Sequence, residues 1–219
     1  MKKIAVILSG CGVYDGAEIH EACGALLALH RAGAHATACA PSGPQMHVVD
    51  HASARPVAGA SRDILVESAR LVRGAITPLA SLDPGDFDGV LLPGGFGAAK
   101  NLCTFAADGA ACLVHPEVEA FLRGARAAGR PIAAMCIAPV ILARLFGSGG
   151  APSLTIGNDA ATAALVTAMG ARHVDCAATD VVVDDGARLV TTPAYMLAAD
   201  IGEAFASAEA VVKKLLTLC

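Results

Sequence analysis

Cys136 is the residue whose type and position best suit it for chemistry. It lies in the stretch AAMCIAPVILARLF (133–146), between a strand-like and a helix-like segment, with Ala134 and Ala138 two positions away on either side. A nucleophile on a sharp strand–helix turn needs small residues there, because bulky ones would clash. If the helix begins at Ile137, its free N–H groups point at the sulfur and lower the thiol pKa. A buried core cysteine is the alternative interpretation.

A glycine-rich stretch, LLPGGFGAAKNL (91–102), supplies a second candidate element. A hydrophobic strand that ends in Pro-Gly-Gly places backbone N–H groups at the carboxyl end of a sheet, where ligands bind in open α/β folds. Gly94 and Gly95 let the backbone approach a ligand closely. The N–H groups of Gly95 and Ile137 could then form an oxyanion hole, with Asn101 lining the same site. A glycine turn without any ligand is the alternative.

Two carboxylates, Glu18 and Glu21, lie on the helix expected after the first strand. A carboxyl group near the cysteine could accept or donate a proton, although most helix glutamates are solvated surface charges. Cys11, in a Gly-Cys-Gly turn that ends the first strand, could also line the site. His173 is the only histidine after Cys136, and no pattern connects it to the site.

The elements that must position these residues alternate between strand and helix. The apolar run 2–10 predicts a buried strand, 16–33 a helix ended by Gly33, and 34–40 a second strand. This alternation predicts a parallel sheet with right-handed crossovers. Further strands are expected in 87–97 and 131–135, hairpins in 41–62 and around Asp185-Gly186, and helices in 62–74, 116–129, 137–146, 159–170 and 197–216.

Composition limits the class of protein. The 219 residues are 55% hydrophobic and 16% charged, which predicts one α/β domain, 1–219, with a large core. The net charge of −4 and the absence of basic blocks argue against nucleic acid and anionic membranes as partners. No stretch approaches the roughly 20 apolar residues of a membrane span. The high apolar fraction also predicts a homodimer.

Eight cysteines are scattered through the sequence, and no two form a C-x-x-C pair. This spacing gives no support for a metal ribbon or a thioredoxin-like motif, so no metal is expected. Scattered cysteines of this kind are usually reduced and buried, which predicts a cytoplasmic location.

Several stretches taken together resemble the ElbB family of isoprenoid-biosynthesis glyoxalases, within the PfpI-type, class I glutamine-amidotransferase-like superfamily. The resemblance runs from Lys2 to about Leu216. It implies a flavodoxin-like three-layer sandwich with a mostly parallel sheet, a nucleophile elbow at Cys136, and glyoxalase activity without glutathione, metal or other cofactor. The stretches are KKIAVILSGCGVYDGAEIHEA, LLPGGFGAAKNL, MCIAPVIL, LTIGND and VTTPAYM.

A more distant resemblance, to the Parkinson-associated deglycase, selects between the two carboxylates. The helix glutamate of that protein lies twelve residues before an Ala-Gly helix end, and counting back from Gly33 gives Glu21 rather than Glu18. The sequence also departs from its superfamily. Protease-like members place a histidine directly after the nucleophile, where this chain has Ile137, and amidotransferases need a late His-x-Glu that is absent. These departures argue against peptidase and amidase activity.

The resulting hypothesis is a glyoxalase that acts on small 1,2-dicarbonyls. Cys136 would add to an aldehyde of glyoxal to give a hemithioacetal, and Glu21 would move a proton between the two carbons to yield glycolate. The alternatives are a non-enzymatic redox or metabolite sensor that uses an oxidisable Cys136, and a protein deglycase.

Overall fold

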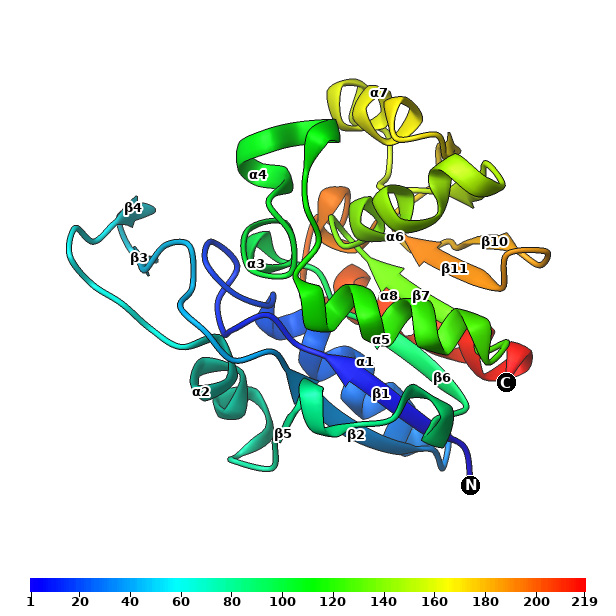
Figure 1. The fold of residues 1–219 in the computed structure, drawn as a ribbon, viewed down its shortest axis with the longest axis horizontal. Coiled ribbons are helices and arrows are strands. Elements are labelled where there is room, and N and C mark those ends of the chain that lie inside the picture. Colours follow the sequence, from blue (N-terminus) through cyan, green and yellow to red (C-terminus); the bar gives the residue numbers. More distant parts are fainter.

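A seven-stranded sheet forms the centre of the computed structural model, which describes residues 1–219 (Figure 1). The strand order is β10-β11-β7-β6-β1-β2-β5, and all neighbours are parallel except β10 and β11. This arrangement confirms the predicted flavodoxin-like α/β fold with a mostly parallel sheet. The strands are β1 (Lys3–Ile7), β2 (His35–Ala40), β5 (Thr77–Pro78), β6 (Gly89–Leu92), β7 (Ile132–Met135), β10 (Val182–Asp184) and β11 (Leu189–Thr192).

Helices cover both faces of this sheet. Figure 1 shows α1 (Ile19–Arg31) and α8 (Ile201–Leu218) behind the strands and α5 (Pro116–Ala127) in front of them. The first two pack against each other, and α8 also packs on β7 and β11. A three-layer sandwich results, as predicted. The shorter helices are α2 (Ile64–Ser68), α3 (Phe96–Lys100), α4 (Phe105–Asp108), α6 (Pro139–Phe146) and α7 (Ala160–Ala168).

The central strands are buried because helices lie on both of their faces. Every residue of β6 and β7 is buried, which is typical of parallel strands that read as continuous apolar runs. One hydrophobic cluster of 55 buried residues joins the sheet to the helices. The carboxyl ends of β1, β6, β7 and β11 therefore meet at one edge, held rigidly by the packing beneath them.

Two local features differ from the sequence predictions. The helix after β7 begins at Pro139, not at Ile137, because a turn occupies 136–138. The hairpin between β10 and β11 has a four-residue loop, in which the Asp184 carboxylate accepts the Ala187 N–H at 2.8 Å. Arg188, with φ +56°, takes the left-handed position there, so the turn is wider than a two-residue Asp-Gly turn.

The segment 41–74 and a second small sheet complete the chain. The predicted hairpin is present as β3 (Val49–Asp50) with β4 (Arg55–Pro56). The helix predicted after it is split into α2 and a 3₁₀ turn at Ala69–Val72. The sequence did not predict the parallel pair β8 (Ser153–Leu154) and β9 (Arg172–His173). None of the helices combines the length and apolar character needed to cross a bilayer.

Candidate active site

Cys136 lies on a sharp turn directly after β7. Its φ of +58° is left-handed, a conformation that costs a non-glycine residue roughly 1–3 kcal/mol and that clusters at functional sites. The turn is held by two backbone hydrogen bonds, from the Cys136 N–H to Thr192 O at 3.0 Å and from the Ala138 N–H to Met135 O at 2.9 Å. Ala134 and Ala138 are completely buried. The residue therefore has the strand–turn–helix geometry of a nucleophile elbow.

Glu21 on α1 reaches the sulfur of Cys136 from the next layer. Its side chain is completely buried and hydrogen-bonds with the Cys136 thiol. The carboxylate oxygens also accept the Gly94 N–H at 2.8 Å and the Tyr195 N–H at 3.1 Å. Residues from α1 and from the ends of β6, β7 and β11 thus meet around one thiol.

Gly94 leaves room for this contact. A Cβ at this position would lie 2.3 Å from the Cβ of Cys136 and 2.6 Å from Oε2 of Glu21. Neither neighbour can move away, because one is fixed by the strained turn and the other by two backbone hydrogen bonds. The glycine therefore lets the thiol and the carboxyl approach each other.

The pKa of Cys136 is raised well above its ordinary value. Burial is the main cause, and the negative charge of Glu21 raises the pKa further. The N–H groups of Gly95 and Ile137 hydrogen-bond to the sulfur and lower the pKa, but they do not outweigh burial. The sequence prediction of a lowered thiol pKa is therefore wrong. Its physical basis fails because α6 begins at Pro139 and the sulfur lies beside an acidic group in a desolvated site.

Burial also raises the pKa of Glu21, to about 7. The charge of Glu18 contributes in the same direction, while the N–H groups of Tyr195 and Gly94 and the Cys136 thiol lower the pKa. A carboxyl group with a pKa near neutral can both take and return a proton at the pH of a cell. The site therefore contains a thiol and a proton acceptor in direct contact.

Glu18 has a different task, although it lies only three residues from Glu21. Its Oε2 accepts the Glu21 N–H at 2.7 Å, so it is the N-cap of α1. Its own N–H donates to Gly94 O at 2.9 Å. The structure thus brings Glu21 to the sulfur and leaves Glu18 at the helix end, where it caps α1.

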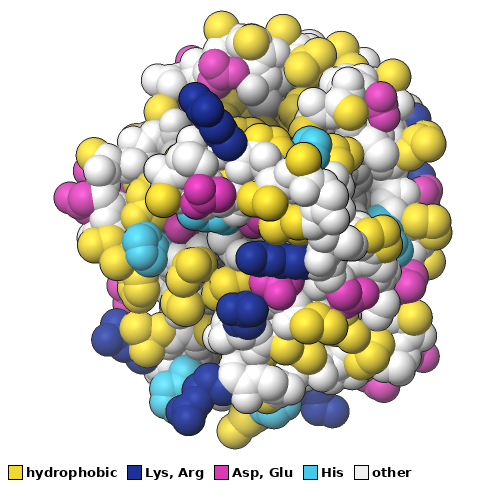
Figure 2. Space-filling model, turned by 90° about the vertical axis from the view of Figure 1, so that its left-hand side faces the viewer, with side chains coloured by type: hydrophobic (Ala, Val, Ile, Leu, Met, Phe, Trp, Pro, Cys, Tyr) yellow, Lys and Arg dark blue, Asp and Glu magenta, His cyan; other side chains and the backbone are white.

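A pocket of about 560 Å³ opens in front of Cys136. It lies at the carboxyl edge of the sheet, between α3, α4 and the segment after β11. Figure 2 views the molecule from this side and shows hydrophobic side chains around a recess, with Lys or Arg side chains beside it. The lining residues are Val13, Gly95, Phe96, Ala99, Lys100, Phe105, Ala106, Cys136, Ile137, Thr162, Tyr195 and Met196.

Three other sequence candidates lie outside this pocket. Asn101 is buried and donates to Ser9 O and Asp15 O, both at 2.8 Å, so it braces the loop after β1 instead of lining the site. Cys11 lies in that loop and does not line the pocket. His173 on β9 accepts the Ile156 N–H at 3.3 Å and has a structural role.

Tyr195 is a site residue that no local sequence pattern predicted. Its N–H binds Glu21, and its hydroxyl lies 2.8 Å from Nδ1 of His20, so the side chain is fixed at both ends in the pocket wall. The stretch VTTPAYM contains it, but only its position after β11 connects it to the site.

No group of three or more His, Cys, Asp or Glu side chains is arranged to hold a metal ion.

The sequence profile of the DJ-1/PfpI family matches residues 2–208. The chain belongs to this family. It is 44% identical over 225 residues to the human glutamine amidotransferase-like class 1 domain-containing protein 3, mitochondrial, a match that covers 99% of this chain and 83% of that protein. The zebrafish ES1 protein, mitochondrial, is 35% identical, with coverage of 90% and 78%.

Solved structures agree with this assignment. An isoprenoid biosynthesis protein with an amidotransferase-like domain from Ehrlichia chaffeensis superimposes with a TM-score of 0.91 at 34% identity, covering 99% of this chain and 100% of that one. Drosophila melanogaster DJ-1beta shares the fold, with a TM-score of 0.57 at 24% identity and coverage of 99% and 95%.

Proposed function

We propose that this protein is a glutathione-independent glyoxalase that converts glyoxal and other small 1,2-dicarbonyls into 2-hydroxy acids. The observation that carries the proposal is the direct contact of the Cys136 thiol with Glu21, at the end of a pocket. The two backbone N–H groups of Gly95 and Ile137, aimed at the sulfur, complete the set of groups needed. The similarity to the isoprenoid biosynthesis protein supports the same class of protein.

The first step is addition of sulfur to an aldehyde carbon of glyoxal. As the C–S bond forms, the thiol proton passes to Glu21, which has a pKa of about 7 and is already hydrogen-bonded to the thiol. The carbonyl oxygen becomes an alkoxide beside the N–H groups of Gly95 and Ile137 and then takes that proton back. A hemithioacetal on Cys136 and a free Glu21 carboxylate result, so the raised thiol pKa does not prevent attack.

The second step moves hydrogen between the two carbons. Glu21 removes the proton from the sulfur-bearing carbon to form an enediolate and returns it to the neighbouring carbon, while the hydroxyl proton of the first carbon passes to the oxygen of the second. The first carbon is oxidised to a thioester and the second is reduced to a hydroxymethyl group, so no external oxidant or reductant is needed. Hydrolysis of the thioester releases glycolate and restores the thiol.

A redox or metabolite sensor is the second candidate function. A Glu21 carboxyl that is half protonated near neutral pH could donate a hydrogen bond to an oxidised Cys136, which favours this candidate. The raised pKa and low exposure of the thiol favour the enzyme instead, because oxidation is fastest at exposed thiolates. A protein deglycase is a variant of the same chemistry, with the dicarbonyl delivered as an adduct on another molecule.

One comparison of rates separates the enzyme from the sensor. We expect measurable turnover of glyoxal to glycolate by the purified protein, and slow oxidation of Cys136 by hydrogen peroxide followed by mass spectrometry. The proposal fails if glyoxal is not converted while peroxide oxidises Cys136 rapidly.

We also propose a homodimer with a cytoplasmic location. Large hydrophobic side chains are exposed on two helices that pack together, Ile19 and Leu27 on α1 and Ile201 on α8. A shared apolar surface of this kind is a candidate dimer face. Light scattering at micromolar concentration tests the oligomer, and a monomer mass contradicts it. Cell fractionation tests the location.

A further inference from the structure

The pocket in front of Cys136 is much larger than glyoxal. Its volume is about 560 Å³, in the range of pockets that hold drug-sized ligands. Glyoxal has only four non-hydrogen atoms, and at roughly 30 Å³ for each water-sized group it fills on the order of 100 Å³. Most of the pocket therefore stays without substrate atoms when glyoxal is bound at the sulfur.

The unused part of the pocket is apolar. Nine of the twelve lining residues are hydrophobic. Phe96 and Phe105 come from α3 and α4, and Tyr195 and Met196 from the segment after β11. Aromatic rings and a methionine give contact area to an apolar ring or chain but bind a small hydrated dialdehyde poorly.

Lys100 is the only charged residue in the lining. Its Nζ donates to Tyr14 O at 2.7 Å and lies 5.3 Å from the centre of the Phe96 ring. No carboxylate lies within 4.0 Å of it. Burial lowers the pKa of Lys100, and the charge of Asp15 raises it. An ammonium group has three donors. Lys100 therefore has hydrogen-bonding capacity left for a ligand inside a partly desolvated pocket.

Two of the lining residues lie at opposite ends of α3. Gly95, whose N–H points at the sulfur, is the N-cap of this helix, and Lys100 is its last residue. At 1.5 Å of rise per residue, the two backbone positions lie roughly 7 Å apart along the helix. This backbone separation exceeds one helical turn of about 5.4 Å, which leaves room for an apolar ring or a short chain between the two residues.

We propose, resting on the proposed function, that the preferred substrate is an anionic dicarbonyl with an apolar body. A 2-oxoaldehyde at one end reacts with Cys136, and a carboxylate at the other end binds Lys100. A ring or a short hydrocarbon joins the two ends. Lys100 is then a specificity-determining residue. The chemistry at Cys136 stays as described, because the reacting carbons are the same two dicarbonyl carbons.

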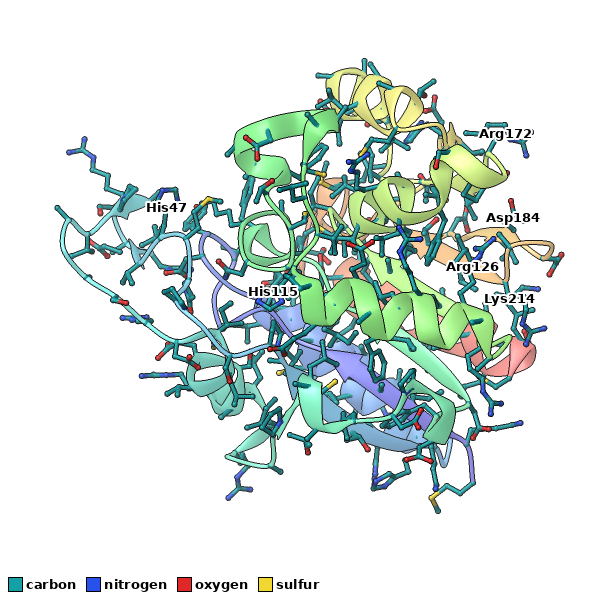
Figure 3. All side chains as sticks on the ribbon, in the orientation of Figure 1. His47, His115, Arg126, Arg172, Asp184 and Lys214 are labelled. Atoms are coloured by element: carbon teal, nitrogen blue, oxygen red, sulfur yellow. The ribbon has the colours of Figure 1, made fainter.

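Matched substrates test this inference. The values of kcat/KM are measured for phenylglyoxal and for 4-carboxyphenylglyoxal, which differ in one carboxylate. We expect the wild type to prefer the carboxylate by about 10-fold or more, since a charge-assisted hydrogen bond in a desolvated site is strong. Lys100→Gln abolishes this preference and Lys100→Arg keeps it. Lys214→Gln, on α8 on the side of the molecule away from α3, is the matched control and keeps the wild-type ratio (Figure 3).

A binding measurement separates this inference from the proposed function. Acetophenone and 4-acetylbenzoate resemble phenylglyoxal and 4-carboxyphenylglyoxal in shape but lack the reactive aldehyde. Their affinities are compared by ligand-observed NMR. Tighter binding of 4-acetylbenzoate to the wild type, lost in Lys100→Gln, supports the inference even if no dicarbonyl is converted. A lack of conversion by itself overturns only the proposed glyoxalase activity. The inference is overturned if the wild type does not favour the carboxylate, or if folded Lys100→Gln favours it equally.

Discussion

Cys136 and Cys112 are both buried thiols, but their surroundings are opposite. Cys112 is completely buried, and a hydrogen bond with Cys103 is the main cause that lowers its pKa. The positive charge of Arg144, whose Nε donates to Cys112 O at 2.6 Å, lowers the pKa further. Cys136 lines the pocket and touches Glu21, and burial together with that carboxyl raises its pKa.

The difference shows that thiol acidity does not locate the reactive site of this fold. Cys112 has the lower pKa, but it does not line the pocket, and no carboxyl group contacts its sulfur. Cys136 has the higher pKa, but a substrate can reach it and Glu21 can take its proton during attack. A nucleophile that gives up its proton only as the new bond forms needs a neighbouring base more than it needs a stable thiolate.

The largest expected effect comes from exchanging the sulfur at each site for oxygen. Cys136→Ser should lose glyoxal turnover below detection, because a hydroxyl is far less acidic than a thiol and Glu21 cannot compensate for that difference. Cys112→Ser should keep turnover within about 3-fold, since general acid–base and nucleophilic groups remain in place. Activity is measured as glycolate formed per enzyme.

Circular dichroism establishes that both serine variants are folded, and Cys103→Ser and Cys176→Ser extend the control to other thiols. The comparison breaks if Cys112→Ser is as damaging as Cys136→Ser. Full activity in folded Cys136→Ser would remove this residue from the mechanism.

The second effect concerns the two carboxylates of α1. Glu21→Gln should reduce kcat by about 10²–10⁴-fold, because glutamine fits the site but cannot accept a proton. Glu18→Gln should reduce kcat much less, since its amide oxygen can still cap the helix by accepting the Glu21 N–H. The measurement is kcat for glyoxal in both variants, and a larger loss in Glu18→Gln contradicts the assignment of roles.

Local patterns in the sequence were sufficient to predict the parallel α/β fold and the position of Cys136 between a strand and a helix, whereas the family resemblance selected Glu21 as its partner. The strand–Cys–helix pattern depends on residues that are adjacent in the chain, and so does the spacing from Glu21 to Gly33, where α1 ends with a left-handed φ of +70°. The strand alternation similarly follows from short apolar runs.

Properties that depend on packing between distant segments could not be predicted in this way. The pKa of Cys136 is set by burial under other elements and by Glu21, which is 115 positions away in the sequence. Thr162 and Tyr195 reach the pocket from elements that no local motif connects to it. Asn101 was misassigned because its position near Gly95 gave no sign that its amide bonds the loop after β1.

The third effect is on stability, and it sharpens the account of the Cys136 environment. The pKa of Glu21 rises from 4.5 to about 7 on folding. Between these pH values the folded protein holds a proton that the unfolded chain has lost, so the free energy of unfolding falls as pH rises. The fall is about 3 kcal/mol, at about 1.4 kcal/mol per pKa unit, and it levels off above the folded pKa.

Urea denaturation of the wild type and Glu21→Gln at several pH values between 4.5 and 8 measures this term. We expect the stability of the wild type to decrease relative to that of Glu21→Gln as pH rises through this range. Glu18→Gln should keep most of this decrease, because burial is the main cause of the raised Glu21 pKa and the charge of Glu18 is a smaller one. Parallel curves for the wild type and Glu21→Gln would show that the carboxyl is not held in a desolvated site.

The smallest expected effect on catalysis comes from changing the partner of Cys112. In Cys103→Ala the hydrogen bond that lowers the pKa of Cys112 is lost, so this pKa should rise. Glyoxal turnover should stay within about 2-fold, because neither thiol lines the pocket. The pH dependence of Cys112 modification by a small thiosulfonate, read by peptide mass spectrometry, gives the pKa change.

In the wild type at pH 7, Cys136 should be modified faster than Cys112 despite its higher pKa, since it lines the pocket and Cys112 is completely buried. Faster modification of Cys112 would mean that acidity, not access and a neighbouring base, decides which thiol of this protein reacts.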